Sequence, residues 1–416
     1  MRAVLAAFAL GLLLVATGCG SSSAATGSAA GTDAAALVPA SALAFVSADA
    51  RLDSDGWRTI IKTLGPIGVD ATIKNDLPAA VGDEANLAVL GVESGKPEAV
   101  AIVKSKDESK LRALAAKFDE SDGSHYTVQQ VDGWSVVADS AGAFQSVRSA
   151  ASGSSLADDA DFKSAMSKFD GGGLAYAYAR GAATKYLPKQ LQALGGSPKW
   201  IAARLGADSS SLRLQVQAAN VKAPAAYKPS LLRDAPSGSI LAVSFKNAAD
   251  LLARIPSVPF LADLRGITGE GVLYVVPGGI LPVVTLEVRP NDPAAAAASL
   301  RKLAAKIGNS LPLSVERRGA KVLLTTAAPG LNSGGGSLVD DQPFKDALQA
   351  ADVPDEVQWL AYADVQRLTP LVQAFSSLFG VTAKQLPQLE RLGTLVAFGA
   401  TGPGSLNRFE ARLTTK

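Results

Sequence analysis

Two pairs of adjacent carboxylates are the residues of this chain best suited to chemistry. Asp158-Asp159 and Asp340-Asp341 each stand just before a segment that contains Phe-Lys. One carboxylate of such a pair could act as a general acid and another as a base, as in a glycoside hydrolase. Acidic side chains just before a helix also accept its free backbone N–H groups and complement its positive end. We favour this structural interpretation, as helix caps, for all four residues.

Other routes to catalysis lack the residues they need. His125 is the only histidine and Cys19 the only cysteine. A Ser-His-Asp triad would have to use His125, which no Gly-x-Ser-x-Gly motif accompanies, so we expect an exposed loop histidine. A zinc site would need more imidazole or thiolate ligands, and no phosphate-binding loop or dinucleotide fingerprint is present. We therefore predict no metal, no cofactor and no enzymatic activity.

The sequence around Cys19 predicts export. Arg2 is followed by an uncharged, mostly apolar run to Thr17, which is typical of a signal peptide over residues 1–18. The run is shorter than the roughly 20 residues that a membrane-spanning helix needs. Its end, Ala16-Thr17-Gly18-Cys19, resembles the lipobox of bacterial lipoproteins. The resemblance implies cleavage between Gly18 and Cys19, and diacylglycerol carrying fatty acids such as palmitate on the Cys19 thiol.

Two other interpretations of this segment stay open: an ordinary signal peptide cut elsewhere, and a short transmembrane stub. With the lipid in place, residues 19–36 form a tether, because residues 20–32 are small, uncharged and typical of a flexible coil. Two or three acyl chains anchor a protein stably, since each buried CH₂ contributes about 0.8 kcal/mol. We therefore expect a protein at the cell membrane, held by lipid and facing the extracytoplasmic side.

Composition limits the partners. The chain has 416 residues, 48% of them hydrophobic and 19% charged, which is enough for two domains with sizeable cores. Lysine and arginine are scattered and the net charge is only +2, so nothing indicates nucleic acid as a partner. With Cys19 acylated no thiol remains for a disulfide, and packing alone must stabilise the fold.

The body of the chain contains an internal repeat. Four segments recur in the same order: residues 38–47 at 235–244, 111–118 at 300–307, 156–163 at 338–345, and 174–177 at 360–363. The last match makes Tyr362 the counterpart of Tyr176. We predict two diverged tandem copies over residues 37–222 and 230–416, joined by a linker at 223–229.

Within a copy, strand and helix patterns alternate. The first copy predicts strands at residues 43–47, 87–92, 99–104, 126–131, 134–138, 174–179 and 211–218, and helices at 56–64, 108–118, 143–150, 162–169 and 186–205. Asp132-Gly133 is a favoured hairpin turn, and Ser105 and Glu108 have the spacing of a capping box. We predict an α+β fold in which each copy is a largely antiparallel sheet with helices packed on one face. Its opening order is that of a ferredoxin-like unit.

Together these features resemble a known family. The lipobox, the small-residue tether, the opening Leu37-Val38-Pro39-Ala40-Ser41-Ala42 and the Asp-Phe-Lys segments followed by Leu-Ala-Tyr resemble the bacterial domain-of-unknown-function family 3352. The resemblance covers most of the mature chain and implies a location in the cell envelope. That family has no established activity, so the resemblance implies no catalytic residues.

Three functions are consistent with these features. The first is a non-catalytic binding or structural protein of the cell envelope, which contacts an envelope protein or polymer. The second is a carrier or chaperone for an apolar ligand such as a lipid, suggested by the apolar segments at residues 273–276 and 280–286. The third and weakest is a carboxylate-dependent hydrolase of wall glycans that uses the two aspartate pairs.

Overall fold

The computed structural model describes most of the chain after the predicted signal peptide. The described residues are 32–64, 71–93, 95–122, 125–169, 171–186, 198–221, 223–249, 264, 267–278, 282–307, 312–326, 335–374, 389–402 and 406–415. Cys19 and the proposed lipobox lie outside them. The chain forms two compact units, and the described residues up to Asn220 belong to the first and those from Val221 onward to the second.

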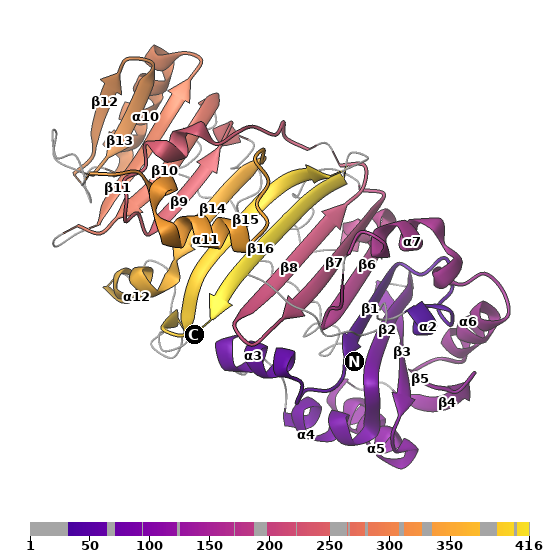
Figure 1. Cartoon of the computed structure of the whole chain (residues 1–416). Coiled ribbons are helices and arrows are strands. Elements are labelled where there is room, and N and C mark those ends of the chain that lie inside the picture. The colour runs from indigo at the N-terminus through magenta and orange to yellow at the C-terminus, as the bar shows by residue number, and fades with distance from the viewer. Residues whose placement is uncertain are drawn as a thin grey trace. The chain divides into compact units, whose positions relative to one another are not determined.

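The first unit is built on an antiparallel sheet (Figure 1). Its strands are β1 (Ala44–Asp49), β2 (Val81–Glu93), β3 (Lys96–Ser105), β4 (Thr127–Val131), β5 (Trp134–Ala138), β6 (Ala175–Arg180), β7 (Trp200–Ala207) and β8 (Ser211–Ala218). Their order in the sheet is β4-β5-β3-β2-β1-β6-β7-β8.

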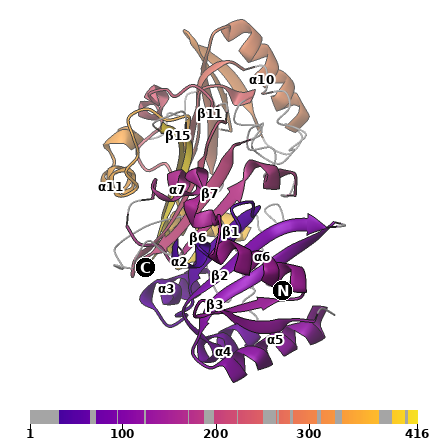
Figure 2. The ribbon, with the colours of Figure 1, turned by 90° about the vertical axis from the view of Figure 1, so that its right-hand side faces the viewer.

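Helices cover this sheet. They are α2 (Thr32–Ala35), α3 (Asp55–Leu64), α4 (Ala71–Ala80), α5 (Glu108–Asp122), α6 (Ala141–Ala151) and α7 (Ala160–Met166), with 3-10 turns η1 (Leu156–Asp158) and η2 (Gly181–Tyr186). Leu111 and Leu114 of α5 share a core cluster with Ala99 and Val103 of β3. Figure 2 shows β2 and β3 between α6 on one side and α4 with α5 on the other, so the helices of the first unit lie on both sides of its sheet and not on one face as predicted. Every residue of β5 is buried.

The second unit repeats this architecture. Its strands are β9 (Leu241–Phe245), β10 (Gly269–Val276), β11 (Val283–Pro290), β12 (Ser314–Arg318), β13 (Lys321–Thr325), β14 (Trp359–Asp364), β15 (Leu392–Gly402) and β16 (Leu406–Thr415). Its helices are α10 (Pro293–Ile307), α11 (Gln342–Ala350) and α12 (Val365–Ala374), with 3-10 turns η3 (Ser230–Arg233) and η5 (Leu338–Asp340). The strand order β12-β13-β11-β10-β9-β14-β15-β16 matches that of the first unit position by position. The predicted α+β class, with two copies of an antiparallel sheet, is confirmed.

In each unit an aromatic pair joins the sheet to the helix that follows a 3-10 turn. This helix is α7 after η1 in the first unit and α11 after η5 in the second. Phe162 of α7 packs edge-on against Tyr178 at 5.3 Å, and Phe344 of α11 packs edge-on against Tyr362 at 5.0 Å. Tyr178 stands opposite Phe45, and Tyr362 stands opposite Ala242, the counterpart of Phe45 in the repeat. Tyr362 is therefore the counterpart of Tyr178. The prediction that it repeats Tyr176 is wrong by two residues, so that the predicted and the true counterpart point to the same face of the strand.

Two predictions about the first copy are also wrong. In a ferredoxin-like unit the first two strands run parallel and are separated by another strand, but β1 and β2 are direct antiparallel neighbours. Residues 200–205 of the predicted helix over 186–205 belong to β7, which pairs with β6 and β8; residues 187–197 of that prediction lie outside the described residues. The alanine-rich sequence of β7 suits a helix, and pairing with strands on both sides overrides that local preference. The predicted hairpin is confirmed, because Asp132 and Gly133 both have the positive φ that its tight turn requires.

The folded body extends into both segments that we predicted to be linkers. Residues 32–35, expected in the tether, form α2, and Ala34 and Ala35 are fully buried. In the predicted linker 223–229, Tyr227 exchanges backbone hydrogen bonds with Val357, and its hydroxyl lies 2.7 Å from Ser244 Oγ. Small apolar and aromatic residues in a short segment can therefore belong to a core, whatever the local composition indicates.

Two glycines give a matched test of core packing. A Cβ on Gly271 in β10 would lie 2.5 Å from Cζ of Phe245, a buried ring of the opposing strand, whereas a Cβ on Gly91 in β2 would meet nothing within 4 Å. We expect Gly271→Ala to lower the free energy of unfolding by about 1–3 kcal/mol through overpacking. Gly91→Ala should change it by less than about 0.5 kcal/mol. Urea unfolding measures both, and equal effects would contradict this packing at Phe245.

Candidate functional site

The first aspartate pair lies where η1 meets α7. Asp159 is the N-cap of α7, and its Oδ1 accepts the backbone N–H of Phe162 at 2.9 Å. Its Oδ2 accepts from Arg180 Nη2 at 2.8 Å. Arg180 also donates from Nε to the Ala42 carbonyl at 3.2 Å and from Nη2 to the Ala40 carbonyl. The carboxylate thus joins the helix start to the turn that precedes β1.

Electrostatics favours the ionised state of this pair. Burial raises the pKa of Asp159, but the Arg180 hydrogen bond and the Phe162 N–H together outweigh burial and leave the pKa below its ordinary value. The exposed Asp158 accepts from Ser155 Oγ at 2.7 Å, and this hydrogen bond is the main cause that lowers the pKa of Asp158. A general acid works best with a pKa near the operating pH, and both carboxyls are shifted away from it.

Asp341 in the second pair contacts the matching turn, but its side chain makes no cap hydrogen bond to α11. Of the four predicted helix caps only Asp159 is therefore confirmed, because Asp158 and Asp340 are the last residues of η1 and η5. Asp341 is the N-cap residue of α11, and its Oδ2 accepts the backbone N–H of Gly238 at 2.6 Å while Oδ1 accepts from Ser237 Oγ. Asp364 occupies the position that Arg180 has in the first unit. Arg367, three residues further on, donates to the Gly238 carbonyl at 3.3 Å. In each unit an aspartate at a helix start therefore fixes the turn before the first strand.

The remaining members of the pairs are less engaged. Asp158 ends η1 and lies 3.9 Å from Lys163 Nζ, and Asp340 ends η5. The structure brings each pair to the turn before its own first strand, as Pro39 bridges to Ser155 and Pro236 to Ser337. Two sequence repeats that we noted separately, the opening segment and the Asp-Asp segment, thus meet in space.

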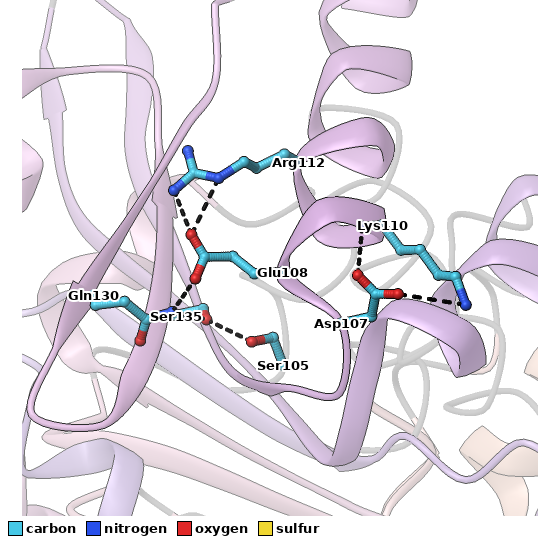
Figure 3. Close-up of polar contacts among 7 residues, drawn as sticks. All are labelled: Ser105, Asp107, Glu108, Lys110, Arg112, Gln130 and Ser135. Carbon is cyan, nitrogen blue, oxygen red and sulfur yellow. Dashed lines mark hydrogen bonds and ion pairs between the residues drawn. The ribbon is translucent and has the colours of Figure 1, made fainter.

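A second polar cluster surrounds the start of α5 (Figure 3). Asp107 accepts from the Lys110 backbone N–H at 3.1 Å and from Ser109 Oγ at 2.6 Å, and its Oδ2 lies 3.5 Å from Lys110 Nζ. The hydrogen bond from Ser109 is the main cause that lowers the pKa of Asp107. Asp107 therefore caps this helix, and the predicted capping box with Ser105 is wrong.

The same cluster ties α5 to the sheet. Glu108 accepts from Arg112 Nε at 3.1 Å and from Gln130 Nε2 at 3.1 Å. Gln130 Nε2 also donates to Ser135 Oγ at 2.8 Å, and Ser135 donates to Ser105 Oγ at 3.0 Å. The Arg112 hydrogen bond is the largest cause that lowers the pKa of Glu108. The network connects β3, β4 and β5 with the helix and holds its carboxylates ionised (Figure 3).

The second unit contains an ion triad that sequence reasoning missed. Lys321 Nζ lies 2.7 Å from Asp234 Oδ2 and 2.9 Å from Glu287 Oε1, and the Glu287 side chain is only 6% exposed. Burial lowers the pKa of Lys321, but the hydrogen bonds that it donates to both carboxylates outweigh burial and raise the pKa overall. Trp134 occupies the place of Lys321 in the first unit, with Lys104 Nζ 4.7 Å from its ring centre. The available signal was Glu287 itself, a charge inside an apolar strand.

The other predicted chemistry is placed as follows. The His125 side chain is 90% exposed, and its Nδ1 lies 3.6 Å from Asp119 Oδ2. Within the described residues, no three histidine, cysteine, aspartate or glutamate side chains are placed to hold a metal ion. In that same part of the chain, no helix has both the length and the apolar composition to cross a bilayer.

Comparisons with known proteins add little. No protein-family profile matches the chain, and no curated protein sequence matches it. One solved structure, titled "Structure of crystal form III of TP0453", is 10% identical, covering 70% of this chain and 91% of that chain, with a TM-score of 0.17. A likeness this low carries no argument about fold or function.

Replacing Asp159 tests the role of its ion pair. Asp159→Asn keeps the cap to Phe162 and removes the charge that Arg180 meets, and we expect unfolding to become easier by about 1–2 kcal/mol at neutral pH. Because the folded pKa of Asp159 is lowered, its contribution is fully present above the unfolded value of about 3.9. It is lost as the pH falls through the folded pKa.

The matched control is Asp161→Asn in α7, which breaks an ion pair at 2.6 Å with Lys199, whose side chain is 56% exposed. Such exposed pairs contribute about 0–1 kcal/mol. Urea unfolding between pH 3 and pH 7 measures both variants. A difference between the wild type and Asp159→Asn that does not shrink in acid would rule out the ion-pair role.

Proposed function

We propose that this chain is an extracytoplasmic lipoprotein, anchored through Cys19, that acts as a non-catalytic binding or structural protein of the cell envelope. The observation that carries the non-catalytic part is the use of Asp159 and Asp341. Both carboxylate oxygens of each of these aspartates are occupied by hydrogen bonds: from Phe162 and Arg180 in Asp159, and from Ser237 and Gly238 in Asp341.

The shifted carboxylates and cations of the described residues support the same conclusion. The pKa values of Asp107, Glu108, Asp158 and Asp159 are lowered, and those of Arg51, Arg180 and Lys321 are raised. All of these shifts stabilise the charged form, which is the signature of structural ion pairs and hydrogen bonds. Catalytic groups are shifted toward the operating pH instead.

The anchor and the start of the folded body fit one another. Residues 20–31, which lie outside the described residues, separate Cys19 from α2, and the flexible tether that we predict from their composition would span roughly 20 Å. The folded body would therefore stay within about one protein radius of the membrane surface, where it can contact envelope components without entering the bilayer.

The two alternative functions gain no specific support. The apolar strands that suggested a lipid cavity are used inside the second unit, since Val272 and Tyr274 belong to one of its core clusters and Leu286 and Val288 to another. Glycan hydrolysis would require Asp159 and Asp341 to exchange protons from within their hydrogen-bonded turns. Both functions stay predictions from the sequence.

The anchor is tested by Cys19→Ser. Because a serine hydroxyl is not the thiol that the lipobox resemblance requires, we expect this variant to incorporate no radiolabelled palmitate and to leave the membrane fraction. Ser21→Ala is the matched control and should keep both label and membrane location. Palmitate on the Cys19→Ser chain, or an intact wild-type precursor in the cytosol, would contradict the proposal.

The binding role is tested by cross-linking in intact cells followed by purification of the full chain. We expect the wild type to recover the same envelope protein or polymer in repeated experiments. The Cys19→Ser chain should recover less of it, because it is no longer concentrated at the membrane. Repeated failure to recover a reproducible partner would count against a binding function.

A further inference from the structure

Strand β4 ends the sheet order of the first unit, and Figure 1 shows no described element beyond it on that side of the unit. In the β4–β5 hairpin, Val131 faces Trp134 next to the two-residue turn, followed by Gln129 with Val136 and Thr127 with Ala138. These residues exchange hydrogen bonds with β5, because bonded pairs alternate along antiparallel strands from the closing pair of the turn. The N–H and C=O groups of Val128 and Gln130 consequently point away from the sheet.

The outward backbone groups differ in how they are satisfied. The next outward N–H, that of Tyr126, is capped by Asp119 Oδ1 at 2.6 Å. The backbone groups of Val128 and Gln130 have no partner among the described residues. An open edge two residues long, flanked by a capped position, is a template for a further strand.

The matching edge of the second unit shows what a protected edge looks like in this fold. Strand β12 is the counterpart of β4, and its sequence Ser-Val-Glu-Arg-Arg places charges at Glu316, Arg317 and Arg318. Charged residues on an edge strand oppose pairing with another strand. The sequence of β4, Thr-Val-Gln-Gln-Val, contains no charge. The two copies have therefore diverged at this position. The edge strand β12 carries charges that oppose pairing, and the unguarded edge strand β4 carries none.

The occupant that best fits the unguarded edge is a second copy of the same strand. A two-fold axis at Gln129 places Val128 of each copy opposite Gln130 of the other, so their outward N–H and C=O groups form about four mutual hydrogen bonds. The same axis places each central residue against itself. That residue is the neutral Gln129 in β4, whose Oε1 accepts a hydrogen bond from Arg148 of α6. The equivalent axis in β12 would oppose Glu316 to Glu316, and like charges directly opposite are destabilising.

We propose that two copies of this chain associate through antiparallel pairing of their β4 strands, with the two-fold axis at Gln129. The sheet of one first unit then continues into the sheet of the other. The pairing keeps α5 on the same face in both copies, because residues opposite one another in a sheet point to the same side. The association goes beyond the proposed anchoring and does not require it.

A single introduced cysteine tests this geometry, because Cys19 is the only native one. In the proposed pair the two Gln129 residues are a non-hydrogen-bonded pair with Cα atoms about 4.5 Å apart, within the range of a disulfide. Gln129→Cys in the full-length chain, oxidised mildly in membranes and again after detergent extraction, should give a disulfide-linked dimer severalfold more abundant than in the wild type. Gln130→Cys is the matched control and should not, because its counterpart is Val128.

A second variant separates pairing from misfolding. Gln130→Pro removes an outward N–H and leaves the backbone bonds from β4 to β5 unchanged, so in the Gln129→Cys background it should abolish the dimer while urea unfolding still shows a folded chain. Gln130→Ala in the same background is its control, because it loses the same side-chain bonds to Ser135 and Glu108 but keeps the N–H and should keep the dimer. A Gln129→Cys dimer no more abundant than that of Gln130→Cys would overturn the proposal. A disulfide to a different protein would equally overturn it in favour of a foreign strand. Neither result depends on lipid at Cys19, since the detergent-extracted chain is tested as well.

Discussion

The fold of each unit depends on how the chain enters its first strand. β1 and β9 pair with strands on both sides, so a slip of one residue there would turn every side chain of a central strand to the wrong face. Asp159 with Arg180, and Asp341 with Ser237 and Gly238, hold the turn directly before these strands. We infer that the aspartate at the helix start helps to set the register of the first strand in each unit, and in the first unit it also caps the helix.

The two copies reach this constraint through different side chains. In the first unit an arginine bridges the carboxylate and two turn carbonyls, whereas in the second the carboxylate contacts the turn directly. The position of Arg180 then becomes Asp364, whose side chain accepts the backbone N–H of Arg367 at 3.0 Å. Both units keep the aspartate and a link from it to the turn, which passes through Arg180 in the first unit and is direct in the second.

Much of this fold could be predicted from the sequence because its signals are local. The Asp132-Gly133 turn, the hairpin around it and the α+β class follow from residue types and spacing alone. The wrong predictions concern segments whose secondary structure or strand register is set by residues distant in the sequence. β7 has a helical composition and is a strand because β6 and β8 pair with it, and Tyr362 was assigned to the wrong partner because a short repeat leaves the strand register ambiguous by two residues.

The candidate site shows the same division. The sequence drew attention to Asp159 and Asp341, but Arg180 is 21 residues from Asp159, and Ser237 is 104 residues from Asp341. Only the fold brings Arg180 and Ser237 next to these aspartates. Their hydrogen bonds are the reason that we regard the carboxylates as structural.

The ion triad of the second unit holds the segment that leads into β9, and the first unit has no counterpart of this triad among its described residues. Replacing a buried ion pair by apolar residues is often neutral for stability, and the first unit has Ile102 and Trp134 where the second has Glu287 and Lys321. In the second unit Lys321 joins Glu287 to Asp234, the residue that follows η3. Glu270 accepts the N–H of Leu231 in that same turn at 2.6 Å. The charges thus fasten the segment through which the chain enters its second copy, where a purely apolar contact would be less directional.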